Sequence, residues 1–181
     1  MKIIFLDIDG VLNSNAFFKA HKLPDNFDSR NDTHQALMID PCAVAKLNGI
    51  IAATCALVII SSSWRFYWSR VRIKAMMALR GFSGDIIGAT PCLDTLPTIT
   101  KSGEIGEREG TLRIVRPCPV TRGDEIVAFL AEHRKKKMRF VVLDDDARGM
   151  ECVGDRFVKI NPQIGLTDRD ADCAIQILKT S

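Results

Sequence analysis

Residues 3–10 read Ile-Ile-Phe-Leu-Asp-Ile-Asp-Gly, a short run of apolar, strand-forming residues that stops at a carboxylate. A strand that is buried on both faces gives such a run, as the strands of a parallel sheet do. Gly10 lets the backbone turn sharply after the strand, so Asp7 and Asp9 can point toward one place. The stretch therefore predicts a central parallel strand with two carboxylates at its carboxyl end.

Two further segments repeat this pattern. Residues 57–60 read Leu-Val-Ile-Ile and are followed by three serines, Ser61 to Ser63, while residues 139–143 are followed by Asp144, Asp145 and Asp146. Ligands of open α/β sheets bind outside the carboxyl ends of the strands. We therefore expect the serines and the two groups of acids to meet in one cleft.

Helical patterns separate these strands. Asp40 is expected to cap a helix that begins at Pro41, residues 64–80 are expected to form a helix that Gly81 ends, and Thr121 and Thr167 are expected to cap two more. Shorter strands are expected at 85–89 and 157–160. The alternation predicts an α/β fold, a three-layer Rossmann-like domain with a mostly parallel sheet, over residues 1–181. Residues 13–39 are expected to form a small cap insertion, and residues 90–120 a loop or hairpin excursion.

Composition places the chain among ordinary globular proteins, with 46% apolar and 26% charged residues and a net charge of +3. That charge is too small to indicate a nucleic-acid partner by itself. No signal peptide and no apolar run of about 18 residues is apparent, so a cytoplasmic protein with no membrane partner is expected. The six cysteines contain no C-x-x-C pair, and we expect them to be reduced and buried.

The clustered acids carry the predicted chemistry. Carboxylates in one cleft repel one another and cannot all stay ionised without a cation, and Mg²⁺ suits carboxylates that face a substrate phosphate. One of Asp7 and Asp9 can act as a nucleophile and the other as a general acid and then base. Ser61 can donate its hydroxyl to a phosphoryl oxygen, and Arg122, at a predicted helix start, can add a fixed positive charge.

These residues resemble the haloacid-dehalogenase (HAD) superfamily, whose members are mostly phosphatases and other phosphotransferases. Its first motif, D-x-D-G after an apolar strand, matches residues 5–11, and its second, a Ser or Thr that ends a strand, matches Ser61. Arg122 is the best candidate for the basic third motif, and Asp144-Asp145 match the acidic fourth. More narrowly, five runs together are similar to the HAD domain of Swiss Army Knife RNA-repair proteins: Asp-Gly-Val-Leu-Asn, Ser-Ser-Ser-Trp-Arg, Arg-Gly-Asp-Glu-Ile, Leu-Asp-Asp-Asp and Gly-Leu-Thr.

The resemblance implies a Mg²⁺-dependent phosphomonoester hydrolase that forms an aspartyl-phosphate on Asp7, with Asp9 as the acid and base. It assigns Ser61 and Arg122 to the phosphoryl oxygens. It also implies that Mg²⁺ is held by Asp7, the backbone carbonyl of Asp9 and Asp145, with Asp144 orienting the site. The narrower branch suggests phosphorylated RNA or DNA ends as substrates.

Ser62, Trp64 and Arg65 directly follow the second motif and are expected to bind substrate. Trp64 could stack on a base and Arg65 could hold a neighbouring phosphate. The alternative is that Trp64 packs the following helix onto the core and Arg65 pairs with acids. For the whole chain, the competing functions are a small-molecule phosphatase for nucleotides or sugar phosphates, and a non-catalytic RNA-binding module with the same fold.

Overall fold

The computed structural model describes residues 1–93, 120–133 and 138–180 of the chain. Its centre is a five-stranded sheet in the order β3-β2-β1-β4-β5, and every neighbouring pair is parallel. The strands are β1 (Lys2–Leu6), β2 (Leu57–Ile60), β3 (Ile86–Ala89), β4 (Arg139–Asp144) and β5 (Phe157–Lys159). The strands predicted from the apolar runs are thus confirmed, and the strand that begins the chain lies in the middle of the sheet.

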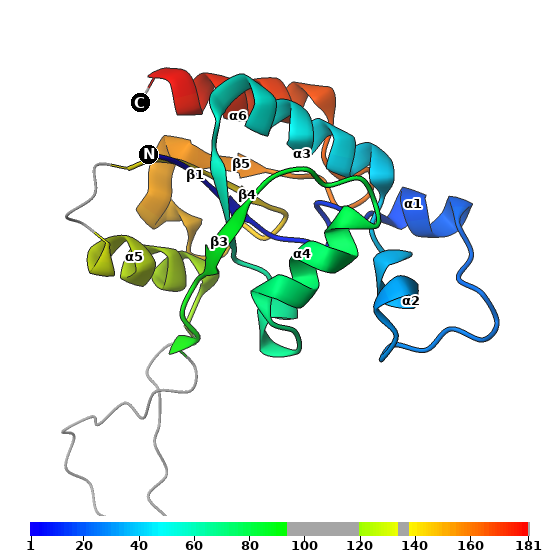
Figure 1. Cartoon of the computed structure of the whole chain (residues 1–181). Helices are drawn as coiled ribbons and strands as arrows, with labels where there is room; N and C mark the ends of the chain where they lie inside the picture. Colours follow the sequence, from blue (N-terminus) through cyan, green and yellow to red (C-terminus); the bar gives the residue numbers. More distant parts are fainter. Residues whose placement is uncertain (94–119, 134–137, 181) are drawn as a thin grey trace, which may run out of the picture.

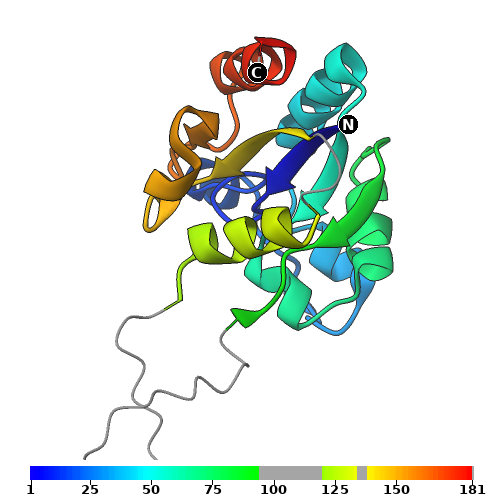
Figure 2. The same ribbon diagram turned by 90° about the vertical axis from the view of Figure 1, so that its left-hand side faces the viewer.

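Helices cover both faces of the sheet, which confirms the three-layer α/β fold. The helices are α1 (Asn15–Ala20), α2 (Asp32–Ala36), α3 (Pro41–Thr54), α4 (Arg70–Ala78), α5 (Arg122–Glu132) and α6 (Asp168–Thr180), with 3₁₀ turns η1 (Ser63–Phe66) and η3 (Met150–Arg156). Helices α3 and α6 lie side by side on one face, and α5 lies on the opposite face (Figures 1 and 2).

Side chains alternate between the two faces along each strand, and this alternation divides the core. Ile4 and Leu6 belong to the larger apolar cluster, which the helices α3, α4 and α6 complete. Ile3 and Phe5 belong to a smaller cluster together with residues of α5 and η3. All four side chains are fully buried, so β1 is enclosed on both sides as its sequence predicts.

The predicted helix starts are confirmed. The Asp40 side chain accepts a hydrogen bond from the backbone N–H of Cys42 (2.8 Å) at the start of α3. Thr121 and Asp124 form a reciprocal capping box at the start of α5. Thr167 caps α6 by accepting a bond from the backbone N–H of Asp170 (3.2 Å). These local bonds satisfy N–H groups that a helix start leaves without partners.

The prediction of a single helix over residues 64–80 is wrong. The chain forms the turn η1, leaves the helical path, and begins α4 at Arg70. Two serines explain the break, because Ser62 caps η1 and Ser69 caps α4 by accepting a bond from the backbone N–H of Arg72 (3.3 Å). Gly81, beyond the end of α4, has a positive φ of 90°, as the predicted helix end requires.

Residues 13–39 contain the two short helices α1 and α2, which lie together at one end of the molecule (Figure 1). Their assignment as a cap stays a prediction. Of the predicted excursion at 90–120, residues 94–119 lie outside the described part of the chain. No helix among the described residues is long and apolar enough to cross a membrane.

The expectation that the cysteines are buried is wrong for those described. Cys42, Cys55, Cys152 and Cys173 are exposed free thiols, and Cys92 is half-buried. Cys42 and Cys173 lie on the outward sides of α3 and α6, so neighbouring apolar residues in the sequence did not indicate burial. Cys118 lies outside the described residues.

Candidate active site

The sheet register aligns the carboxyl ends of its three central strands. Asp7 follows β1, its backbone N–H donates to the carbonyl of Leu143 on β4 (3.0 Å), and the N–H of Ser61 donates to the carbonyl of Leu6 (2.8 Å). Leu6 pairs with Ile60 on β2 and with Leu143 on β4. Asp7, Ser61 and Asp144 are therefore neighbours in one row across the sheet.

The same three side chains lie on the α5 face of the sheet. Each follows by two residues a member of the smaller cluster, and strand side chains repeat their direction every two residues. Those members are Phe5, Ile59 and Val142. Asp7, Ser61 and Asp144 are 6%, 0% and 1% exposed. The fold thus buries two carboxyl groups and a hydroxyl beneath the start of α5.

Asp7, Asp144 and Asp145 form a compact acidic cluster, with one carboxylate oxygen from each within 4.8 Å of the others. The glycine at position 10 leaves room for Asp145 to approach this cluster. It has a φ of 73°, and a Cβ at that position would lie 2.5 Å from a carboxylate oxygen of Asp145. Only glycine accommodates both the backbone conformation and the close approach of Asp145.

Burial gives these acids unusual protonation behaviour. Burial raises the pKa of Asp7 to about 6, although the charge of Arg122 and a hydrogen bond from the Ser62 side chain act to lower it. Burial, together with the neighbouring charge of Asp7, raises the pKa of Asp144 to about 7. The pKa of Asp145 is also raised by burial. Perturbed carboxyl groups that face one another are characteristic of functional sites.

Several polar atoms in this region are buried without a hydrogen-bond partner within the described residues. They are Oγ of Ser61, Oγ1 of Thr90, Nη1 of Arg122 and Oδ2 of Asp144. Nε of Arg122 lies 3.8 Å from Oδ2 of Asp144, close enough for an ion pair but too far for a hydrogen bond. Because an unsatisfied buried polar group costs roughly 1–3 kcal/mol, a cluster of them indicates a place for a ligand.

The Asp9 carboxylate lies apart from this acidic cluster and is more exposed. It accepts hydrogen bonds from Nε1 of Trp64 (3.1 Å to each oxygen) and from Nδ2 of Asn13 (3.0 Å). The Ser62 side chain acts to lower the pKa of Asp7, and its Oγ accepts a hydrogen bond from the backbone N–H of Trp64 (3.4 Å). The bonds from Trp64 to Asp9 and the interaction of Ser62 with Asp7 connect the loop after β2 to the loop after β1.

Arg65 is buried and bound to α5 and to its own loop. Its guanidinium pairs with Glu125 of α5, and the two side chains are only 6% and 7% exposed. Nη1 of Arg65 also donates to the carbonyl of Ser62 (2.6 Å), and its guanidinium carbon lies 4.4 Å from the centre of the Phe66 ring. The placement of Arg65 therefore matches the alternative in which it pairs with an acid.

The model of one protein family, described as the HAD domain in Swiss Army Knife RNA repair proteins, matches residues 3–171. The chain belongs to this family. No match was found among curated proteins or among solved structures. The resemblance and the fold predicted from the sequence are confirmed, and membership places the chain in a superfamily composed mainly of phosphatases.

The residues of this HAD domain suit a hard divalent cation such as Mg²⁺. All the clustered donors are carboxylate oxygens, which magnesium prefers. Among the described residues no hydrogen bond reaches the buried Oδ2 of Asp144, and burial together with the charge of Asp7 raises the pKa of Asp144. A cation among Asp7, Asp144 and Asp145 would relieve both costs.

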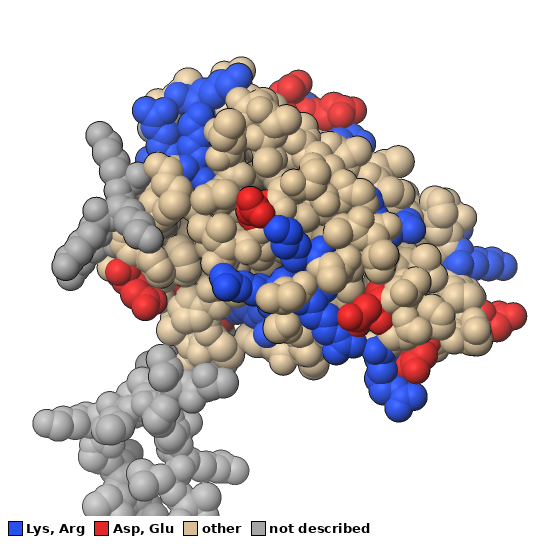
Figure 3. All heavy atoms as spheres, viewed as in Figure 1, with Lys and Arg blue, Asp and Glu red and all other residues tan. Residues whose placement is uncertain are grey.

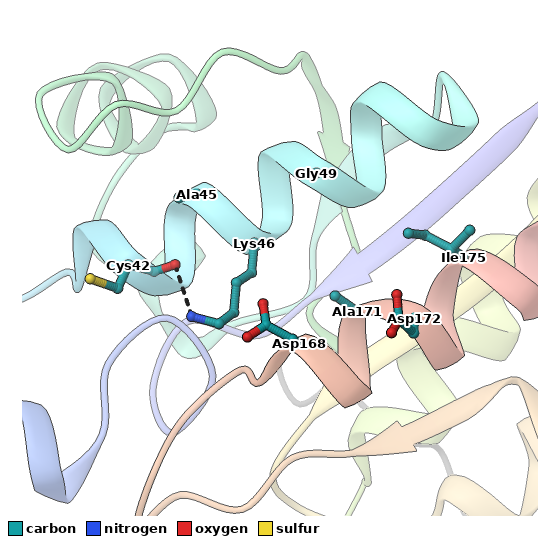
Figure 4. A pocket seen from close by; sticks show the side chains of 8 residues that line it. All are labelled: Cys42, Ala45, Lys46, Gly49, Asp168, Ala171, Asp172 and Ile175. Atoms are coloured by element: carbon teal, nitrogen blue, oxygen red, sulfur yellow. Dashed lines mark hydrogen bonds between the residues drawn. The ribbon is translucent and has the colours of Figure 1, made fainter.

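The HAD domain also has a groove of about 520 Å³ between α3 and α6, lined by residues of those helices (Figure 4). Across it Lys46, whose Nζ lies 3.5 Å from the carbonyl of Cys42, faces Asp168. None of the residues at the strand ends lines this groove. We therefore assign the chemistry of the domain to the acidic cluster rather than to the groove.

Basic side chains gather over α4, with acidic side chains beside them (Figure 3). Three basic residues come from this helix. Arg72 pairs with Asp32, Lys74 pairs with Asp85 (2.7 Å), and Arg70 donates to the carbonyl of Ile87 (2.6 Å). Part of the positive charge on this surface is thus already neutralised within the HAD domain.

Sequence reasoning missed three residues of the site. Asn13 ends the run Asp-Gly-Val-Leu-Asn and Glu125 stands in the run Arg-Gly-Asp-Glu-Ile, three residues after Arg122 in a predicted helix, but neither residue was given a role. Thr90 follows β3, and its N–H donates to the carbonyl of Ile60 (2.9 Å), so it joins the same sheet edge. Its position after a weak strand pattern was the available signal.

Proposed function

We propose that this HAD domain is a Mg²⁺-dependent phosphomonoester hydrolase with Asp7 as its nucleophile. One observation carries the proposal. Within the described residues, the Ser61 hydroxyl and the Arg122 guanidinium each have a buried donor that makes no hydrogen bond, next to a buried carboxylate. A tetrahedral phosphoryl group offers acceptor oxygens to both donors and an electrophilic atom to the carboxylate.

The reaction that these residues support has two halves. A carboxylate oxygen of Asp7 attacks phosphorus, the bond from phosphorus to the leaving oxygen breaks, and the Asp9 carboxyl gives that oxygen a proton. In the second half Asp9 takes a proton from water, and the water oxygen attacks phosphorus of the aspartyl-phosphate. The bond to the Asp7 oxygen then breaks, which releases inorganic phosphate and regenerates the carboxylate.

The donors around phosphorus act in both halves. Ser61 and Arg122 hold the phosphoryl oxygens, and Arg122 also neutralises charge beside Asp7, whose pKa it acts to lower. Asp7 and Asp145 would hold Mg²⁺, with the Asp9 carbonyl, and Asp144 would orient them. When bound, the ion neutralises the acids and withdraws charge from the phosphoryl oxygens.

We further propose phosphorylated ends of RNA or DNA as the substrate. The description of the family, which refers to RNA repair, supports this class. The small size of α1 and α2, which would leave the strand ends open to a polymer, also supports it. Ser62, Trp64 and Arg65 were expected to bind substrate, but the bonds of Trp64 and Arg65 within the domain favour a structural contribution from these two.

Phosphate release tests both levels of the proposal. The substrates are 5′- and 3′-phosphorylated oligonucleotides, the matching mononucleotides and a sugar phosphate, each with Mg²⁺ and with EDTA. Release should require Mg²⁺, and Asp7→Asn should lower it by several orders of magnitude. Asp7→Asn activity within tenfold of wild type would contradict the nucleophile. If mononucleotides are the better substrates at low and moderate salt, the small-molecule phosphatase replaces the nucleic-acid proposal.

A further inference from the structure

Trp64 and Asn13 both donate hydrogen bonds to the Asp9 carboxylate. Nε1 of Trp64 lies 3.1 Å from both carboxylate oxygens, and Nδ2 of Asn13 lies 3.0 Å from one of them. Asn13 is itself fixed, because its Oδ1 accepts a bond from the backbone N–H of Gly10 (2.8 Å). The carboxylate of Asp9, the second aspartate of the D-x-D-G motif, is thus oriented by two donors.

The two donors are rigid, whereas their acceptor is exposed. Trp64 is 5% exposed and Asn13 is 3% exposed. The Trp64 ring also packs against Trp68, with ring centres 5.1 Å apart. Side chains enclosed in this way have little freedom to move, so they impose their geometry on Asp9 rather than adapting to it.

We infer that Trp64 and Asn13 are positioning residues that aim Asp9 at the leaving oxygen of the substrate. The inference rests on the proposed function for the role of Asp9 as proton donor. Both donors are neutral N–H groups, so they can orient a carboxyl group without taking over its proton. An ionised carboxylate has about four lone-pair sites, and these bonds leave part of that capacity free for a proton.

This role replaces base stacking for Trp64. A base needs an open aromatic face, and a ring that is 5% exposed between Trp68 and the Asp9 loop offers little of one. The contact also joins residues 55 positions apart, so it fixes the loop after β2 relative to the loop after β1. Trp64 therefore acts on the reaction through Asp9 rather than through the substrate.

NMR of the two indole N–H groups tests the contact without any need for activity. The chain has only two tryptophans. Trp68→Phe therefore identifies the Trp64 signal in a ¹⁵N-labelled protein. Asp9→Ala, a change at an exposed residue, should shift the Trp64 indole signal and speed its hydrogen exchange, with a smaller effect on Trp68. A Trp64 signal that is the same with and without the Asp9 carboxylate would overturn the inference.

Kinetics with two leaving groups test the consequence. p-Nitrophenol leaves without a proton, whereas an alkyl alcohol needs one, and a positioned general acid contributes about 10²–10⁴-fold. Trp64→Phe should therefore lose about tenfold more kcat/KM on an alkyl phosphate than on p-nitrophenyl phosphate, because kcat/KM reports the steps up to departure of the leaving group. Trp68→Phe, the matched control, should affect both substrates equally.

Equal losses of kcat/KM on both substrates in Trp64→Phe would overturn the proton-positioning role. A wild-type protein that hydrolyses neither substrate would instead overturn the proposed function, and the proton-donor role of Asp9 with it. The indole measurement separates these cases, because it reports whether Asp9 is held by Trp64 even in an inactive protein.

Discussion

Replacing Glu125 by glutamine should destabilise the protein far more than a surface change of the same kind. Glu125 pairs with Arg65, and their side chains are 7% and 6% exposed. The substitution keeps the shape of the side chain but removes its charge. Arg65 cannot lose its proton in compensation, since a guanidinium stays charged in proteins. It keeps only the Ser62 carbonyl (2.6 Å) and the Phe66 ring as described partners.

The burial of the pair sets the size of the effect. Burial already lowers the pKa of Arg65, and Glu125 acts against that lowering. Breaking a buried pair by removing one partner costs about 3–5 kcal/mol. Since glutamine can still accept a hydrogen bond, we expect the lower end of that range. In a domain of this size each kcal/mol lowers the melting temperature by about 2–4 °C, so a decrease of about 10 °C is expected.

An exposed pair in the same protein provides the control. Lys74 and Asp85 are 2.7 Å apart, but their side chains are 45% and 68% exposed. Asp85→Asn should therefore cost less than about 1 kcal/mol, because exposed pairs contribute little. Urea denaturation of both variants measures the difference. If Glu125→Gln loses no more than Asp85→Asn, the Arg65 charge is solvated and the reasoning fails.

A double variant separates the unpaired charge from other effects. Arg65→Met combined with Glu125→Leu replaces the pair by apolar side chains of similar volume, a change that is often nearly neutral. The double variant should therefore be more stable than Glu125→Gln alone. A double variant at least as unstable as Glu125→Gln would show that altered packing, rather than an unpaired Arg65 charge, accounts for the loss of stability.

Two further predictions concern the acids and the start of α5. Because the pKa values of Asp7 and Asp144 are raised to about 6 and about 7, folding favours their protonated forms. The stability that they contribute in EDTA should be full below about pH 4 and lost as the pH rises through 6 to 7. Melting temperatures across this range should fall less in Asp144→Asn, and an equal fall would contradict the assignment. Gly123→Ala should cost about 1–3 kcal/mol, since its Cβ would lie 1.7 Å from the carbonyl oxygen of Gly149. Gly49→Ala, where nothing lies within 4 Å, should instead stabilise α3, and a loss in Gly123→Ala no larger than in Gly49→Ala would refute the close contact.

The sequence was sufficient for the sheet and for the positions of the strand ends. The runs that became β1, β2 and β4 are short, apolar and bounded by polar residues, so their burial on both faces could be predicted locally. Once parallel strands are placed side by side, Asp7, Ser61 and Asp144 must meet at one edge. The helix caps at Asp40, Thr121 and Thr167 are likewise local, because each depends on residues within one turn.

Contacts between distant segments could not be predicted in this way. Arg65 and Glu125 are 60 positions apart, and nothing in either local pattern specifies the other. The break after η1 depends on whether Ser69 caps a new helix or stays inside one, and propensity alone does not decide between them. The prediction that the cysteines are buried was wrong for a related reason. An apolar neighbour in the sequence can face the opposite side of a helix.

The five residues that follow β2 connect the parts of the candidate site. Ser61 follows β2 and pairs with Leu6 of β1, the Ser62 side chain acts to lower the pKa of Asp7, and Trp64 donates to Asp9. Arg65 then pairs with Glu125, one turn along α5 from Arg122.

Helix α5 is held from two sides as a result. The Arg65 pair fastens it to the loop after β2, and Gly123 lets its first turn approach the carbonyl of Gly149 in the loop after β4. Arg122 begins the same turn of α5, with its Nε 3.8 Å from Oδ2 of Asp144. Since a charge stabilises a phosphoryl group best when it is held in place, any role of Arg122 would depend on the Arg65–Glu125 pair and on Gly123 as well. A loss of activity in Arg65 variants therefore does not by itself indicate contact with a ligand.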